Sequence, residues 1–188
     1  ILVQRNNLLK QIRFQNNLIE TLEAWDIQLV KYGSEVIKYR EKFIKHLGEV
    51  CQKIHNKLTG GKEKILLEYD RDVGYDSYLT ELAKKRQKDL KYSTTTVGPH
   101  RDDISFIVNG IDIRKYGSQG QQRTAALSLK LAQIQLMREV MKESPILLLD
   151  DVLSELDSNR KTYLLESIKD TQTVSYTHLR AHETLRHL

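Results

Sequence analysis

The sequence predicts an α/β protein in which a long helical stretch precedes a shorter region of alternating strands and helices. Residues 1–58 contain no proline, and their apolar side chains recur at helical spacing. The four consecutive apolar residues 146–149 are typical of a strand buried on both faces of a parallel sheet. Between these regions, a turn at 117–120 leads into an amphipathic helix.

The composition indicates a folded protein rather than a membrane or secreted one. The 188 residues, of which 39% are hydrophobic and 29% charged, can bury one core and a second smaller unit. The single cysteine, Cys51, excludes a disulfide framework and suits a reducing cytoplasm. The sequence has neither a run of about 18 apolar residues nor a signal peptide pattern, so we predict no membrane partner. The net charge of +5 suits a polyanionic partner, but a mildly basic surface explains it equally well.

Helical periodicity predicts one long helix or two over residues 1–58, which pack on another part of the protein. Thr59-Gly60-Gly61 ends this stretch, since glycine commonly follows the last turn of a helix. The predicted apolar stripe has members seven residues apart and others between them: Leu29, Val36, Phe43, Leu47, Val50, Ile54 and Leu58.

Residues 64–70 are predicted to form a strand and residues 76–92 a helix with an acidic N-terminal cap. The basic run at 84–91 either contacts DNA phosphates or is the solvated face of this helix. A strand beginning at Thr94 is predicted to break at Gly98-Pro99 and to resume over 104–108, before an Asn109-Gly110 hairpin turn. The polar cluster at this break, residues 100–103, is interpreted as a self-satisfied turn with a surface ion pair.

Asp150 and Asp151 follow the buried strand at its carboxyl end, where α/β proteins bind ligands. Mg²⁺ with a nucleotide is the ligand that most often requires carboxylates at such a place. One carboxylate would hold the metal through water, and the other would orient or deprotonate an attacking water. The alternative is a strand that ends at two solvated acids.

The helix that begins near Gly120 offers unpaired N–H groups to a phosphate. Gly120 allows close approach of the backbone, and a hydroxyl and two amides add donors from Ser118, Gln121 and Gln122. A capped helix with nothing bound is the alternative for each residue taken singly. The apolar face predicted to cover the 146–149 strand comprises Ala126, Leu127, Leu129, Leu131, Ala132, Ile134, Leu136 and Met137.

Together these motifs resemble the head domains of ABC-type ATPases of the SMC and Rad50 group. With "VGPHRDD" at 97–103, Trp25-Asp26 and "IHNKLTGGKE" at 54–63, residues 8–174 are most similar to the RecF family. The resemblance implies cytoplasmic proteins of DNA repair, replication and the SOS response that bind ATP and DNA. It also implies an ATP-dependent homodimer that acts with RecO and RecR at single-strand gaps, where it helps to load RecA.

The resemblance also implies roles for individual residues. Asp150 would serve Mg²⁺ as the Walker B residue, and Asp151 would be the catalytic carboxylate. The signature motif would contact the γ-phosphate of ATP held by the opposite subunit; it comprises Ser118, Gly120, Gln121 and Gln122. The D-loop at the same interface would comprise Ser154, Glu155, Leu156 and Asp157. Residues 1–92 would form an arm-like lobe and residues 93–174 the C-terminal part of an incomplete ATPase head.

Two departures from the family pattern qualify this interpretation. No Gly-Xaa-Xaa-Xaa-Xaa-Gly-Lys-Ser/Thr loop occurs, and Gly60-Gly61-Lys62 lacks both its spacing and its hydroxyl. We therefore expect the C-terminal portion of a longer protein, which alone binds ATP feebly and hydrolyses none. Residues 175–188 resemble translated adapter sequence and are predicted to be non-native. His178 and His182 have the spacing of a metal pair, but without a third ligand we predict no zinc site.

Three hypotheses follow. The chain is part of a RecF-type ATP-dependent DNA-binding protein, part of another SMC or Rad50-type ATPase, or a non-enzymatic helical interaction module. The short arm and the "VGPHRDD" turn favour the first over the second. ATP-dependent dimerisation after the missing half is supplied would separate the first two from the third.

Overall fold

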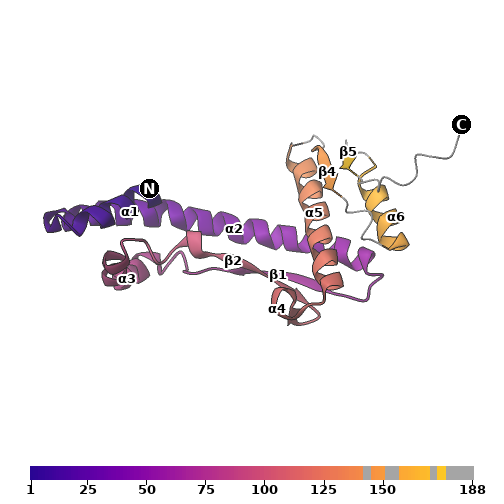
Figure 1. The fold of residues 1–188 in the computed structure, drawn as a ribbon, viewed down its shortest axis with the longest axis horizontal. Helices are drawn as coiled ribbons and strands as arrows, with labels where there is room; N and C mark the ends of the chain where they lie inside the picture. Colours follow the sequence, from indigo (N-terminus) through magenta and orange to yellow (C-terminus); the bar gives the residue numbers. More distant parts are fainter. Residues whose placement is uncertain (142–144, 151–156, 170–172, 177–188) are drawn as a thin grey trace, which may run out of the picture. The chain divides into compact units, whose positions relative to one another are not determined.

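The structure, a computed structural model, describes residues 1–141, 145–150, 157–169 and 173–176. The chain divides into two compact units, and its elements can be followed from indigo to yellow in Figure 1. Unit 1 consists of Ile1–His46 and Leu67–Phe106, and unit 2 consists of Leu47–Leu66 and Ile107–Leu188. The predicted domain boundary at residue 92 lies inside unit 1. Within the described residues, no helix combines the length and apolar character needed to cross a membrane.

The helical stretch at the N-terminus consists of two helices. α1 (Leu2–Ile12) and α2 (Leu22–Leu58) are joined by the 3-10 helix η1 (Asn16–Thr21). Gly60 and Gly61 follow α2 with φ values of 59° and 79°, so the predicted glycine stop is confirmed. The last twelve residues of α2 belong to unit 2.

The predicted apolar stripe of α2 is partly wrong. Val36 and Phe43 are 40% and 55% exposed, whereas Ile37 and Ile44, one position further along, are buried. The stripe is correct at Leu29 and in the last turns of the helix, where Leu47, Val50, Ile54 and Leu58 are buried.

Three strands form one sheet in the order β1-β2-β3. β1 (Ile65–Asp70) confirms the predicted strand, and β2 (Asp103–Val108) pairs antiparallel with β3 (Ile111–Asp112). The predicted hairpin turn is confirmed, because Asn109 and Gly110 have φ values of 50° and 84°. α3 (Tyr78–Tyr92) begins after Ser77, which forms no side-chain cap. The predicted acidic cap is therefore wrong.

The β-branched residues 94–97 do not form the predicted strand. The N–H and the hydroxyl of Thr95 both donate to Asn6 Oδ1, at 2.8 and 2.7 Å. Thr96 makes the equivalent pair of bonds to Asp89 Oδ1, at 2.9 and 2.7 Å. Side chains therefore take the backbone donors that a strand ladder would need, which explains the irregular conformation.

Unit 1 encloses a buried ionic cluster around Arg5, which is 0% exposed. Its Nε donates to Asp26 Oδ1 at 2.7 Å, and its Nη1 donates to Asp89 Oδ2 at 2.8 Å and Thr95 Oγ1 at 2.7 Å. Arg86 adds a 2.9 Å bond to the second oxygen of Asp26. Two members of the predicted basic run at 84–91, Arg86 and Asp89, therefore belong to this cluster. The exposed cations of the run are Lys84, Lys85, Lys88 and Lys91.

The turn predicted to hold a surface ion pair is instead centred on a buried carboxylate. Asp102, with its side chain 2% exposed, accepts bonds from Arg40 Nη1 and from the N–H of Asp72, both at 3.0 Å, and from the Tyr69 hydroxyl. Burial, followed by the bond to Asp102, raises the pKa of Tyr69 to about 12. The cluster joins α2 to the end of β1, which makes it structural.

Unit 2 contains the short helix α4 (Ile113–Tyr116), α5 (Gln119–Met141), β4 (Leu147–Asp150), α6 (Ser158–Ser167) and β5 (Thr173–Tyr176). α5 begins one residue before the predicted start at Gly120. β4 confirms the predicted strand and lies parallel to β5, with Asp150 opposite Tyr176. β5 therefore extends two residues beyond the predicted end of native sequence at 174.

Burial in unit 2 differs from the prediction in two places. Ile146 and Leu148 are 63% and 69% exposed, so the strand is not buried on both faces. In the described part of the chain β4 has one neighbouring strand, β5. On α5, Ala126 and Met137 are exposed and the other predicted apolar residues are buried or half-buried.

Candidate functional site

The N-terminus of α5 is closed by a capping box between Ser118 and Gln121. The N–H of Gln121 donates to Ser118 Oγ at 3.2 Å, and the N–H of Ser118 donates to Gln121 Oε1 at 3.1 Å. These two bonds satisfy two of the N–H groups that a helix start leaves without intrahelical partners. The same two residues were predicted to face a phosphate. Their local function in this structure is to fix the start of the helix.

Gly120 lies at the open side of this capped turn. A Cβ placed there would meet only Ser118 Oγ, at 3.9 Å. Internal packing therefore does not demand glycine at this position, and its predicted contact with a phosphate stays a prediction. Gln122 is held from the other side, since its Nε2 donates to the carbonyl oxygens of Ile113 at 2.8 Å and Gly117 at 3.4 Å.

A buried histidine, His55 of α2, connects the 59–64 loop with α5. Its Nδ1 lies 2.9 Å from Ser128 Oγ, and its Nε2 lies 3.3 Å from Glu63 Oε2. The other oxygen of Glu63 accepts a 3.2 Å bond from Gln121 Nε2. The side-chain amide of Gln121 is therefore held at both ends, by Ser118 and by Glu63.

The pKa of His55 is lowered from its ordinary value. Burial is the largest cause, and the positive charge of Arg160 acts in the same direction, whereas the Glu63 carboxylate raises the pKa. The net effect keeps His55 neutral at neutral pH.

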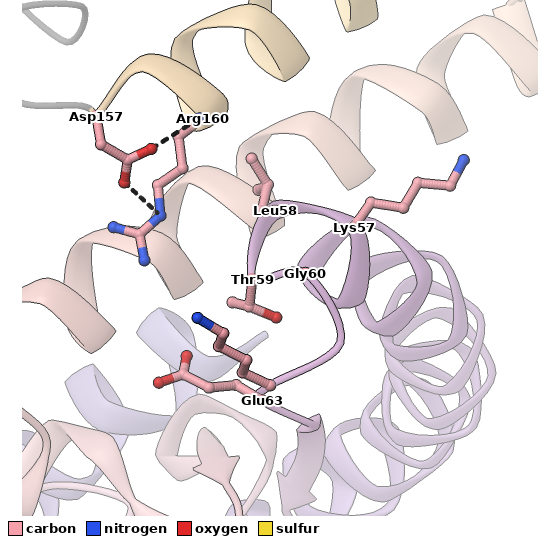
Figure 2. Close-up of a pocket in the computed structure, with 8 residues that line it drawn as sticks. Lys57, Leu58, Thr59, Gly60, Glu63, Asp157 and Arg160 are labelled. Atoms are coloured by element: carbon pink, nitrogen blue, oxygen red, sulfur yellow. Dashed lines mark hydrogen bonds and ion pairs between the residues drawn. The ribbon is translucent and has the colours of Figure 1, made fainter.

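A cavity of about 470 Å³ lies beside this loop (Figure 2). Asp157, the last residue of the predicted D-loop, caps α6 by accepting a 3.0 Å bond from the N–H of Arg160. Its second oxygen lies 3.4 Å from Arg160 Nε. Figure 2 shows the Lys57 side chain pointing away from Glu63. Both signs of charge line the cavity, through Lys57, Lys62, Glu63, Asp157 and Arg160.

The predicted metal and catalytic carboxylates are only partly placed. Asp150 ends β4, as predicted, but its side chain lies outside what the structure describes. Asp151 and residues 154–156 of the predicted D-loop also lie outside the described residues, as do His178 and His182. Within the described ranges, no group of three or more histidine, cysteine or acidic side chains could hold a metal ion. The roles of these residues stay predictions.

Sequence reasoning assigned no chemical role to His55, Glu63 or Arg160. His55 and Glu63 both lie in the "IHNKLTGGKE" segment, which contributes to the family resemblance and carries no chemical motif of its own. The available signal was weak: a histidine in a helix of apolar periodicity usually has a local structural role. The decisive partner, Ser128, is 73 residues away.

Comparison with known proteins gives a consistent result. No protein-family model matches the chain. The DNA replication and repair protein RecF of Agathobacter rectalis is 56% identical over 173 residues, which are 92% of this chain and 48% of that protein. The protein of the same name from Lachnospira eligens is 54% identical over 176 residues, 93% of this chain and 48% of that protein. A solved structure of the recombination mediator protein RecF with ATP, in the RecFOR pathway, has a TM-score of 0.84 at 38% identity, over 97% of this chain and 51% of that one.

The helix α5, the strand β4 and the long helical lobe define an incomplete head of the ABC-type ATPase class. Within this class the chain belongs to the RecF family and matches its C-terminal part. It spans about half the length of the curated relatives it matches.

Proposed function

We propose that this chain is part of an ATP-dependent DNA-binding protein of recombinational repair and replication restart. The whole protein would work in the cytoplasm with RecO and RecR and help to load RecA at single-strand gaps. The observation that supports this most strongly is the 56% identity to a RecF protein over 173 residues, together with the fold shared with an ATP-bound RecF structure. In this proposal residues 1–92 are the arm-like lobe and residues 93–174 the C-terminal part of the head.

The start of α5 would bind the γ-phosphate of ATP held by a second subunit. The capping box fixes the direction of the first turn. A Cβ at Gly120 would meet only Ser118 Oγ at 3.9 Å, which supports room for an anion beside the backbone. The positive end of the helix dipole favours negative charge at this place. Ser118, Gly120, Gln121 and Gln122 would form the signature contact, with the D-loop residues 154–157 beside it.

Catalysis would depend on the carboxyl end of β4. Asp150 would hold Mg²⁺, directly or through water, and Asp151 would orient the attacking water. ATP with Mg²⁺ would supply the γ-phosphate and the charge that neutralises its oxygens. Because the 188 residues contain no phosphate-cradling Gly-Lys-Ser/Thr loop, we expect this chain alone to bind ATP weakly and to hydrolyse none.

DNA contact would be made with phosphates rather than bases. Lys85 and Lys88 are exposed on α3, whereas Arg86 is engaged by Asp26 and Asp89 is buried. Phosphate contacts do not read sequence, and their affinity falls steeply with salt.

The direct test joins this chain to the N-terminal half of the Agathobacter rectalis RecF, whose matched part is 56% identical. The joined protein should dimerise only with ATP, as measured by light scattering, and should then bind gapped DNA. Asp151→Asn should trap the dimer by slowing hydrolysis by about 10²-fold or more. Asp76→Asn, which changes an exposed carboxylate in unit 1, is the matched control and should behave as the unchanged protein.

A joined protein that is folded but stays monomeric with ATP would contradict the proposal. The non-enzymatic interaction module would then be the better explanation. Dimerisation with ATP but without DNA binding would instead favour another ATPase of the same class.

A further inference from the structure

Four large apolar side chains of unit 1 form an exposed row on α2, which we call the open stripe. The exposed fractions are 49%, 40%, 73% and 55% for Tyr32, Val36, Tyr39 and Phe43. Their spacing of four, three and four residues places them on one face, over about three turns of the helix. Among the described residues, no segment buries this face. A face of this kind is typical of a helix that packs against a second helix.

The open stripe interrupts a helix that is packed elsewhere. Trp25, one heptad before the stripe, packs against the apolar side chains of α1. Val50, one heptad after it, is 5% exposed and belongs to unit 2. On the other side of α2, Ile37 forms a core with Tyr78 of α3, which lies below α2 in Figure 1. The uncovered face therefore has a defined length, which a helix of about three turns would fill.

The size of the open stripe argues against a second copy of this chain as its occupant. Aromatic side chains bury about 150–250 Å² each, so the stripe offers roughly 400 Å² in its exposed fractions. Two stripes face to face would bury roughly twice that area, whereas a stable interface between separate proteins buries about 1,200–2,000 Å². A segment of the same polypeptide loses far less translational and rotational freedom on docking, so a smaller patch is sufficient.

Lysines border one edge of the open stripe. Lys31, Lys38 and Lys42 are exposed along this edge, with Glu35 between them, so its net charge is positive. At the opposite edge, the Arg40 guanidinium already donates to the buried Asp102 carboxylate. An occupant helix would therefore be complementary if it combined an apolar stripe with carboxylates along the edge that meets the lysines.

We infer that the open stripe is an intramolecular docking site for an acidic-edged amphipathic helix of the N-terminal half of the whole protein. This chain spans about half the length of its RecF relatives and matches their C-terminal part, so the other half supplies a covalently linked segment. The inference rests on the proposed function, because it takes the chain to be part of such a whole protein.

The test measures thiol modification on two sides of α2 in the joined protein described above. Val36→Cys places a thiol of similar size in the open stripe, and Lys45→Cys, nine residues further along, places one on the opposite side of the helix. Mass spectrometry of each peptide after maleimide treatment gives the rate, divided by the rate of the same variant unfolded in urea. The native Cys51 is 0% exposed and contributes little background.

The joined protein should modify Cys at position 36 about tenfold or more slowly than Cys at position 45, because docking must open first. In the 188-residue chain the two rates should agree within about twofold, since both positions are then exposed. Equal rates at the two positions in the folded joined protein would overturn the inference. Slow modification at position 36 in the chain alone, together with a dimer in light scattering, would assign the stripe to a second copy and would also overturn it.

Charge reversal tests the acidic edge. Adding Lys31→Glu and Lys42→Glu to the Val36→Cys joined protein should accelerate its modification by about threefold or more, through repulsion of the occupant's carboxylates. Lys84→Glu with Lys91→Glu, on the exposed side of α3, is the matched control for total charge and should leave the rate unchanged. Equal effects of the two pairs would contradict an acidic edge.

Failure of the inference and failure of the proposed function look different. A joined protein that dimerises with ATP while position 36 stays reactive would overturn the docking site and leave the proposed function in place. Protection of position 36 without ATP-dependent dimerisation would support the docking site and contradict the proposed function.

Discussion

Each unit buries an ionisable cluster, but the two clusters differ in whether their charge is permanent. In unit 1, the Arg5 guanidinium lies between Asp26 and Asp89 and donates to both. In unit 2, the buried imidazole of His55 lies 3.3 Å from the Glu63 carboxylate. A guanidinium does not lose its proton in a protein, whereas an imidazole does so near neutral pH. The first cluster is therefore a fixed structural element, and the second can respond to its surroundings.

The largest expected effect comes from breaking the permanent cluster. Arg5→Met leaves two buried carboxylates without their cation, which should lower the free energy of unfolding by about 3–5 kcal/mol. Chemical denaturation followed by fluorescence reports on this unit, because Trp25, the single tryptophan, lies in it. Arg86→Met is the matched control: Arg86 is 36% exposed and pairs with Asp26, so its loss should cost about 1 kcal/mol or less. An equal decrease in the free energy of unfolding of the two variants would contradict a fixed structural role for the Arg5 cluster.

The second effect compares a packed glycine in unit 1 with an open one in unit 2. Gly98 has a φ of 133°, and a Cβ there would lie 2.2 Å from Tyr78 Oη. Gly98→Ala should therefore destabilise unit 1 by about 3 kcal/mol, through backbone strain and overpacking. Gly60→Ala, at a φ of 59° with nothing within 4 Å, should cost about 1 kcal/mol. Denaturation midpoints that fall equally would show that packing against Tyr78 has no effect.

A smaller effect is expected at the capping box. Ser118→Ala removes the acceptor of the Gln121 N–H and should destabilise the start of α5 by about 1 kcal/mol. Hydrogen exchange at Gln121 measures this locally. Ser118→Asn retains a good cap and should restore protection. If Ser118→Asn exchanges as fast as Ser118→Ala, the hydroxyl has a role other than capping.

The smallest effect concerns the contribution of His55, in unit 2, to the pH dependence of the free energy of unfolding. The pKa of His55 is lowered in the folded state, so the unfolded state binds more protons between that value and about 6.5. Stability is therefore fully present above this window and falls as pH decreases through it. Urea midpoints at several pH values, compared with those of His55→Gln, measure the contribution. If the urea midpoints of both proteins fall in parallel as the pH decreases, groups other than His55 cause the pH dependence.

Local sequence patterns predicted the elements whose signals lie within a few residues. The glycine stop after α2, the Asn109-Gly110 hairpin turn, the start of α5 and the strand β4 are all observed close to their predicted places. The errors occurred where distant partners compete with local preference. Thr95 and Thr96 form side-chain bonds with Asn6 and Asp89 instead of a strand, and Asp102 is buried among α2 and β1 residues rather than exposed.

The candidate site divides in the same way. The Ser118–Gln121 capping box depends on residues three positions apart, and such spacing is visible in the sequence. The environment of His55 depends on Ser128, which is 73 residues away, and that of Arg5 depends on Asp89, which is 84 residues away. The sequence by itself therefore determined the helix and turn signals and the family, because those depend on local spacing and residue identity. Only the tertiary structure decided which titratable and charged groups are buried together, because burial and pairing depend on distant segments that meet in the fold.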